Sequence, residues 1–208
     1  MQFVSFFLSS KASLVAQDFP CFVSFPLVYR SIYLKLLSIL LLIPMAIASA
    51  SEQAFDRTEV GVIEIKSLPA SKVIKSTSDT SYFEANNLFM PLFWYITTRD
   101  IAMTAPVEVE LDPGVMYFYI GTDAQERALK STGTVRVESF PERTVAAIGY
   151  QGAYTEDQFN EAKTRLEAWL VEQTDISPIG EANAVYWHGP SVPNAQKHAE
   201  VHIPVEVL

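Results

Sequence analysis

Strict alternation of apolar and polar residues marks the most distinctive stretch of the chain. After a polar break, Val107, Val109 and Leu111 share one face while glutamates occupy the other, as expected of a half-buried strand. The core of this stretch, Pro-Val-Glu-Val at residues 106–109, returns at residues 204–207. A four-residue echo has little weight alone, but it directs attention to a longer internal repeat.

A longer duplication surrounds this echo. Residues 65–73 and 137–145 both read apolar, charged, Ser, apolar, Pro, any three residues, Val, at a shift of 72 residues (137 − 65). The same shift carries Tyr82 onto Tyr154, and each tyrosine leads into a helical pattern. Each half therefore reads strand, turn at proline, strand, helix and one or two further strands.

Two such halves predict one mixed α+β domain with a pseudo-twofold axis, built from duplicated βαββ-type repeats of about residues 59–120 and 134–208. A groove between related halves is a natural ligand site. Alternatively, the repeat records only how the fold was built.

The strands are predicted from alternation and from the turn signals that bound them. Tyr117 and Tyr119 fall on one face of their strand, where they either line a cavity or cover the sheet. A short helix is expected at residues 124–129 and a turn at residues 177–180. The expected strands are residues 59–66, 71–78, 108–111, 115–120, 135–140, 144–149, 184–188 and 200–207.

Two helices are predicted from capping boxes followed by apolar residues at helical spacing. The first begins at residues 81–84, and Pro91 inside it predicts a kink or a break. Phe93, Trp94 and Tyr95 widen its apolar face, so they either belong to the core or wall a flat hydrophobic ligand. The second helix begins at residues 155–158 and is expected to bury Phe159, Ala162, Leu166, Trp169 and Leu170.

The first 50 residues differ from the rest of the chain. The run from Leu36 to Ile47 is almost entirely apolar, follows two basic residues and precedes Ala48-Ser49-Ala50. This pattern predicts a secretory signal peptide cut after Ala50. The run of 12 residues is shorter than the roughly 20 that a membrane-spanning helix needs.

A leader of 50 residues exceeds the usual length of about 15–30. We therefore expect a misassigned start codon, with initiation near Leu27 or Val28; the alternative is a retained, membrane-associated extension. After cleavage we expect an exported protein, periplasmic or secreted, that starts with a loose arm at residues 51–58 and continues as one domain over residues 59–208, with no stable transmembrane segment.

Charge and cysteine content narrow the classes of partner. Residues 51–208 hold 12 basic and 23 acidic residues, a net charge of −11, which disfavours nucleic acid and anionic membranes as partners. The one cysteine, Cys21, lies in the leader, so the exported domain has no disulfide or thiolate chemistry.

Catalytic and metal-binding motifs are missing from the sequence. It contains no P-loop, dinucleotide fingerprint, zinc motif or nucleophile elbow. The spacings of His188, His198 and His202 do not match a standard zinc site, so the metal ligands stay unknown. Most glutamates are expected on solvated strand faces; Glu108 and Glu206, which match in the echo, are kept as paired acids at a symmetric groove. This pattern favours a binding protein over an enzyme.

The assembled features resemble the SOUL haem-binding protein family. The resemblance rests on Phe89-Met90-Pro91-Leu92-Phe93-Trp94-Tyr95-Ile96, on the Ile101-Ala102-Met103-Thr104-Ala105-Pro106-Val107 motif, and on Tyr186-Trp187 through Val205. It covers residues 59–207 and implies a distorted antiparallel barrel with two helices. The second half resembles gyrase-inhibitor-like effector-binding domains, which bind varied apolar or cationic molecules.

The resemblance implies that a tetrapyrrole, with haem as the candidate cofactor, binds in a hydrophobic groove. Family members differ in whether a histidine ligates iron. Many relatives carry an arginine-rich run where this chain has residues 192–198, which leaves Lys197 and His198 as candidates for propionate contacts. The residues expected to line the groove are Phe93, Trp94, Tyr95, Met103, Tyr117, Tyr119, Trp187, His188 and His198.

Three functions follow from these observations. The first is non-catalytic binding of haem, a related tetrapyrrole or another flat apolar molecule. The second is a small-molecule binding or sequestering module of the effector-binding type, in which Glu108 or Glu206 pairs with the charge of a cationic ligand. The third is a hydrolase built on the same groove, using tyrosine and glutamate.

Overall fold

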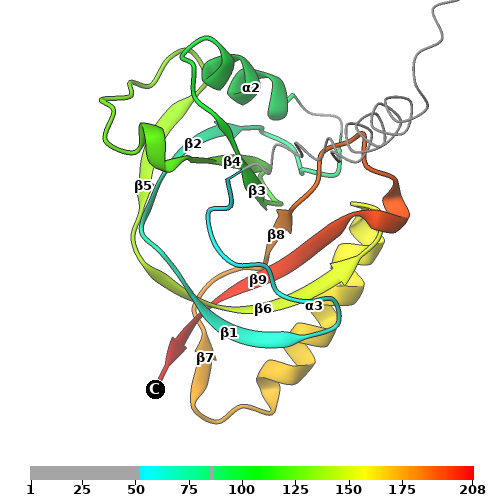
Figure 1. Ribbon diagram of the computed structural model, residues 1–208. Helices are drawn as coiled ribbons and strands as arrows, with labels where there is room; N and C mark the ends of the chain where they lie inside the picture. The colour runs from blue at the N-terminus through cyan, green and yellow to red at the C-terminus, as the bar shows by residue number, and fades with distance from the viewer. Residues whose placement is uncertain (1–51, 85–86) are drawn as a thin grey trace, which may run out of the picture. The chain divides into compact units, whose positions relative to one another are not determined.

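The computed structural model describes residues 52–84 and 87–208 (Figure 1). The predicted leader, its cleavage site and the alternative start lie outside the described residues. None of the helices in the described part has the length and apolar character of a membrane-spanning segment.

The described residues form an α+β fold of one antiparallel sheet and two α-helices. The helices are α2 (Phe89–Thr97) and α3 (Glu156–Val171), and short 3₁₀ turns are η1 (Thr122–Ala124) and η2 (Asn194–Gln196). The strands are β1 (Ile63–Leu68), β2 (Ser71–Thr77), β3 (Met103–Glu110), β4 (Val115–Ile120), β5 (Arg136–Phe140), β6 (Arg143–Gln151), β7 (Ile176–Pro178), β8 (Asn183–Tyr186) and β9 (His198–Val207).

The sheet runs β1-β6-β9-β8-β3-β4-β2-β5, with β7 paired to β9, and it curls into a half-barrel with α2 and α3 outside it (Figure 1). The pair β3–β8 in the middle joins the two halves of the chain, with Val107 opposite Tyr186 and Glu108 opposite Val185. The echoed Pro-Val-Glu-Val segments fall on β3 and β9, which have different neighbours. The echo therefore does not mark equivalent strands.

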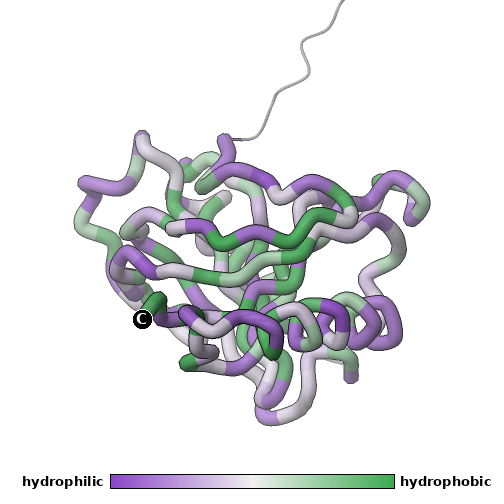
Figure 2. Tube along the Cα trace, turned by 90° about the horizontal axis from the view of Figure 1, so that it is seen from below, coloured by the Kyte–Doolittle hydropathy of each residue, from purple (hydrophilic) through white to green (hydrophobic). Residues whose placement is uncertain are grey.

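Successive residues of a strand face opposite sides of the sheet, and the middle strands are buried on both sides, since all six residues of β4 are buried. One face packs against the helices and is apolar, with Ile74, Phe118 and Val201 among its residues. The concave face packs Val73, Tyr119 and other apolar residues around buried charges. Figure 2 shows this alternation of hydrophobic and hydrophilic residues along the strands.

The second helix was predicted correctly, whereas the first was not. Thr155 caps α3 by accepting a hydrogen bond from the Gln158 N–H (3.4 Å), as its capping box predicts. The expected capping box at residues 81–84 instead forms a turn, and α2 begins only at Phe89. Pro91 thus lies in the first turn of α2, where its missing N–H breaks no helical hydrogen bond, so no kink arises.

Three other local predictions require correction. The helix expected at residues 124–129 is only the 3₁₀ turn η1, and the turn expected at residues 177–180 contains the edge strand β7. Trp169 of α3 is only partly buried.

The arm expected to be loose is packed into the concave face of the sheet. Glu52 and Ala54 exchange backbone hydrogen bonds with Ala105, each 2.8 Å long. The side chain of Phe55 is buried against the rings of Tyr119 and Trp187. Composition alone suggested a flexible segment, but an aromatic side chain and unpaired strand edges give it a docking site.

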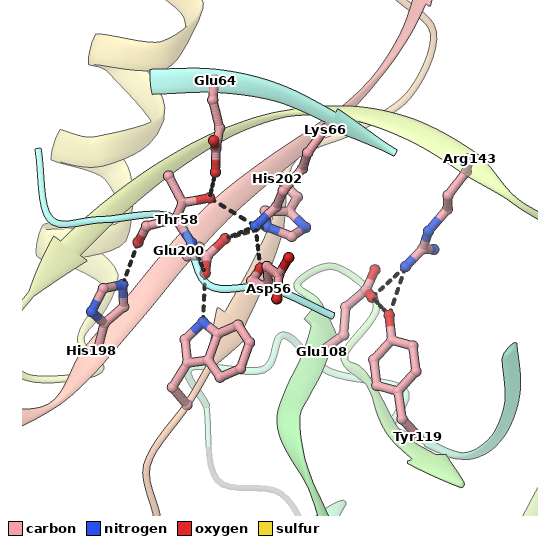
Figure 3. A network of polar contacts seen from close by, with 11 residues as sticks. Asp56, Thr58, Glu64, Lys66, Glu108, Tyr119, Arg143, His198, Glu200 and His202 are labelled. Atoms are coloured by element: carbon pink, nitrogen blue, oxygen red, sulfur yellow. Dashed lines mark hydrogen bonds and ion pairs between the residues drawn. The ribbon is translucent and has the colours of Figure 1, made fainter. Parts of the chain in front are cut away.

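Beneath the arm, the concave face buries two acids that each meet several partners (Figure 3). Glu200 accepts hydrogen bonds from Lys66 Nζ and Trp187 Nε1 and pairs with His202 Nε2, at 2.6–2.7 Å. Glu108 contacts Arg143, the Tyr119 hydroxyl and Asn183 Nδ2. Buried carboxylates need such partners, because an unpaired buried charge is strongly destabilising.

Acid should destabilise the protein through Glu200. Burial opposes its ionisation, but the His202 and Lys66 partners prevail and hold the pKa of Glu200 at about 2, below its ordinary 4.5. The resulting stabilisation is complete above pH 4.5 and is lost as the pH falls through the folded pKa, a loss on the order of 3 kcal/mol. The free energy of unfolding in urea, measured between pH 5 and 2 for wild type and for Glu200→Gln, gives the size of this loss.

Glu206→Gln is the matched control, because Glu206 lies on the same strand but is exposed. This control should keep the wild-type pH dependence, while Glu200→Gln should flatten it. If the free energy of unfolding had the same pH dependence in wild type and in Glu200→Gln, Glu200 would not be the source of the acid sensitivity.

Candidate functional site

A cavity of about 510 Å³ lies on the helix side of the sheet, above the β3–β8 pair. Both halves of the chain contribute to it. Its lining residues are Tyr82, Phe89, Met103, Thr104, Ala105, Val107, Met116, Tyr154, Tyr186, Trp187, His188, Gly189, Pro190 and Lys197. The side chains are mostly aromatic, aliphatic or thioether, so the cavity suits an apolar molecule.

An irregularity in β3 shapes one rim of the cavity. Met103 pairs with Ile120 of β4, but the next paired residue is Val107, opposite Phe118. The register shift frees Thr104 and Ala105 from the regular ladder, and both line the cavity beside Met103. The Thr104 hydroxyl donates to the Tyr119 carbonyl (2.6 Å), so it is engaged with the backbone.

Tyrosines form an aromatic wall of the cavity. The rings of Tyr154 and Tyr186 stack with centroids 4.1 Å apart, and the ring of Tyr82 lies 5.8 Å from that of Tyr186. Burial raises the pKa of Tyr154 to about 12 and raises those of Tyr82 and Tyr186 as well. The phenols are therefore uncharged at neutral pH and present ring surfaces on which a flat apolar ligand can stack.

His188 stands at the cavity with its tautomer fixed. Its Nδ1 accepts the His198 backbone N–H (3.0 Å), and its own backbone N–H donates to the Tyr154 hydroxyl (3.0 Å). Burial and the neighbouring Arg57 charge lower the pKa of His188, which favours the neutral ring. With Nδ1 accepting, the proton of the neutral ring lies on Nε2.

This tautomer does not fit an iron ligand. A histidine that binds a metal through Nε2 needs a free lone pair there, and its other nitrogen usually donates a hydrogen bond. His188 has the opposite arrangement. His198 Nε2 contacts the Thr58 carbonyl (2.7 Å), His202 Nε2 contacts Glu200, and neither residue lines the cavity. The three histidines of this chain therefore do not fit axial ligation of a haem iron.

Clusters of potential metal-ligating side chains are the alternative to the single histidines. Within residues 52–84 and 87–208, no group of three or more His, Cys, Asp or Glu side chains could hold a metal ion.

Among the lining residues that the structure describes, Lys197 is the one cation. Its Nζ donates to Asn194 Oδ1 (2.9 Å) and lies 5.1 Å from the centre of the Tyr154 ring. The described part of the chain contributes no Asp or Glu to the lining. Glu108 is buried on the concave side, and Glu206 is exposed on β9, so the structure does not bring these two acids together at the cavity. The electrostatics favour a neutral or anionic ligand over a cation.

Of the nine residues proposed from sequence, Met103, Trp187 and His188 line the cavity. The other six lie elsewhere. Tyr117 and Tyr119 face the concave side, where their hydroxyls contact Glu110 and Glu108.

On α2, the three aromatic residues have three different environments. Phe93 stacks on Phe89 at 5.8 Å, Trp94 is 57% exposed, and Tyr95 is buried with its hydroxyl donating to the Lys130 carbonyl (2.9 Å). His198, the remaining candidate, is buried behind the cavity wall.

Sequence reasoning missed the aromatic wall. Tyr82, Phe89, Tyr154 and Tyr186 line the cavity but were not among the candidates. One signal was present: Tyr82 and Tyr154 are the pair related by the 72-residue shift. Both rings lie against Tyr186, so the repeated tyrosines converge on the β3–β8 pair.

Comparison with known structures supports the fold. The crystal structure of the EcmrR C-terminal domain shares 16% identity at a TM-score of 0.55, covering 71% of this chain and 98% of that one. In the EcmrR–DNA complex the chain spans only 58% of EcmrR, again at a TM-score of 0.55 and 16% identity, over 71% of this chain. A hydrolase from Listeria innocua shares 9% identity at a TM-score of 0.52, covering 72% and 94% of the two chains.

At these identities the structural likeness establishes the fold alone. No curated protein matches the chain. The family model described as SOUL heme-binding protein matches residues 51–204, nearly all of the part that the structure describes. The chain therefore belongs to the SOUL heme-binding protein family.

Proposed function

We propose that this protein binds a flat, largely apolar small molecule of the tetrapyrrole class in the cavity above the β3–β8 pair, without catalysing a reaction on it. The observation that carries the proposal is the aromatic and methionine-lined cavity of about 510 Å³ between the two halves. This volume falls within the roughly 300–1,000 Å³ typical of small-molecule sites. The family description, heme-binding, supports the same ligand class.

Ring stacking and apolar burial would supply most of the affinity. Tyr154, Tyr186 and Phe89 offer aromatic surfaces, and Met103 and Met116 can adjust their shape to a ligand. Lys197 would attract a carboxylate at the edge of the ligand, as the propionates of a tetrapyrrole provide. In this arrangement a haem is held by its ring and edge, with no bond from a histidine to the iron.

The lining residues favour binding over chemistry. The one aliphatic hydroxyl, Thr104, is committed to a backbone carbonyl, and the phenols resist ionisation. The acids proposed for a cation-binding or hydrolytic site lie outside the cavity. General acid–base catalysis needs a group that titrates near the working pH and lies within hydrogen-bonding reach of the ligand. Glu108 and Glu206 lie outside the cavity and cannot reach a ligand there.

A negative charge in the lining should weaken tetrapyrrole binding. Met103→Glu places a carboxylate at the rim, where it must be desolvated and repels propionates, so haemin affinity should fall at least about 10-fold, or about 1.4 kcal/mol. Absorbance titration in the Soret region measures the effect. Trp94→Ala is the control, since exposed Trp94 does not line the cavity. Unchanged binding in Met103→Glu with loss in Trp94→Ala would place the ligand on the outside of α2.

Removing His188 should leave the iron environment of bound haemin unchanged. In His188→Ala, the Soret maximum should stay at the wild-type wavelength, and metal-free protoporphyrin should bind wild type about as tightly as haemin. A shifted Soret maximum, or binding restricted to the iron-containing ring, would show that His188 ligates the metal.

Lys197 should matter only for ligands that carry carboxylates. Lys197→Ala should weaken protoporphyrin binding up to about 5-fold, the size of a partly exposed ion pair, and leave binding of its dimethyl ester unchanged. Fluorescence titration with both compounds makes the comparison. Lys163→Ala on α3, outside the cavity lining, is the matched control. Equal losses for acid and ester would contradict the assigned role.

A further inference from the structure

The N-terminal arm, of which the structure describes residues 52–58, contributes no residue to the described cavity lining. It crosses the concave face of the sheet, inside the curl of the strands (Figure 1). Phe55 packs edge-on against the Trp187 ring at 5.6 Å, and the Arg57 guanidinium lies 4.7 Å from the centre of the same ring. Trp187 also lines the cavity, so this residue contacts the arm and the ligand site together.

One link between arm and cavity passes through Ala105. The Ala54 N–H donates to the Ala105 carbonyl, and the Ala105 N–H donates to the Glu52 carbonyl, both at 2.8 Å. These bonds occur where the register shift interrupts the pairing of β3 with β4. The arm therefore satisfies the backbone groups of a cavity-lining segment that the sheet leaves unpaired.

A second link passes through His198. Its Nε2 contacts the Thr58 carbonyl of the arm at 2.7 Å, as Figure 3 shows, so this nitrogen carries a proton and donates. The backbone N–H of His198 donates to His188 Nδ1, and its carbonyl accepts from the Tyr154 hydroxyl at 2.9 Å. His198 thus stands between the arm and two lining residues, with hydrogen bonds in both directions.

A shared carboxylate strengthens the same connection. Glu200 Oε1 accepts from the Thr58 N–H of the arm at 2.9 Å and from Trp187 Nε1 at 2.6 Å. Thr58 and Glu200 are fully buried, so water does not compete for these bonds. Displacing the arm would leave one oxygen of a buried carboxylate with a single partner and release Trp187 on its concave side.

We propose that the arm is a positioning element of the ligand cavity and that His198 is the positioning residue that connects them. The docked arm holds the Met103–Ala105 rim, Trp187 and the His188–Tyr154 pair in their binding geometry, although no arm residue lines the cavity. The identity of the ligand rests on the proposed function, whereas the effect of the arm on the cavity wall does not.

The test compares His198→Ala, His198→Gln and Phe55→Ala in the full chain. A glutamine amide N–H reaches about as far as histidine Nε2 and can donate to the Thr58 carbonyl. We therefore expect His198→Ala and Phe55→Ala to lower protoporphyrin affinity about 5- to 10-fold and His198→Gln to restore it to within about 2-fold of wild type. Tyr119→Phe is the control, because it removes a hydroxyl bond to Glu108 on the same face without touching the arm link.

A readout without ligand separates this inference from the proposed function. Nitrogen-15 NMR of His188 should show the Nε2–H tautomer in wild type, His198→Gln and Tyr119→Phe, and a mixture of tautomers in His198→Ala. Amide exchange at Ala105 should accelerate at least about 10-fold in Phe55→Ala, while amides of the β2–β5 pair keep wild-type rates. If wild type binds no tetrapyrrole, the proposed function fails and these signals still decide the inference.

Wild-type tautomer signals in His198→Ala together with wild-type exchange at Ala105 in Phe55→Ala would overturn the proposal. So would an equal loss of affinity in Tyr119→Phe and His198→Ala, since general destabilisation would then account for both. If His198→Ala does not fold, the amide exchange rate at Ala105 in Phe55→Ala and the protoporphyrin affinity of His198→Gln test the proposal instead.

Discussion

The fold of the described residues is built around the pairing of β3 with β8. This pairing joins the two halves of the chain, and because neighbouring residues of a strand face opposite sides, it separates two environments. Val107 and Tyr186 lie under an apolar cavity on the helix side, whereas Glu108 and Val185 face the concave interior. A shift of one residue in this pair would exchange the two sets and place a carboxylate in the ligand site.

Burial of charge on the concave side follows from the curl of the sheet and from the arm that fills it. Glu108 and Glu200 are removed from water there, and each is stabilised only because a cation and several donors converge on it. Such networks favour one arrangement, since a partly satisfied one costs more than an apolar core. The same bonds that hold the charges also hold the arm, and through His198 and Trp187 they reach the back of the cavity.

Local signals in the sequence predicted most strands and α3, because alternation and a capping box act over a few residues. Pro91 was predicted inside a helix but lies in the first turn of α2, because the helical spacing of apolar residues begins upstream of the helix that forms. The cavity could not be predicted in the same way: Tyr82, Tyr154 and Tyr186 are brought together by strand pairing, of which the repeated tyrosines were the one hint. Alternation separates the two faces of a strand but does not show which face meets water. Glu200 belongs to the glutamates expected on solvated strand faces, and it is buried.

The most direct measurement is the structure of the protein with bound haemin. We expect the ring to lie in the cavity above β3–β8, stacked on the Tyr154–Tyr186 wall, with its carboxylates towards Lys197 and no bond from His188 Nε2 to the iron. A ring bound on the exposed side of α2 near Trp94, or an iron ligated by His188, would contradict this expectation.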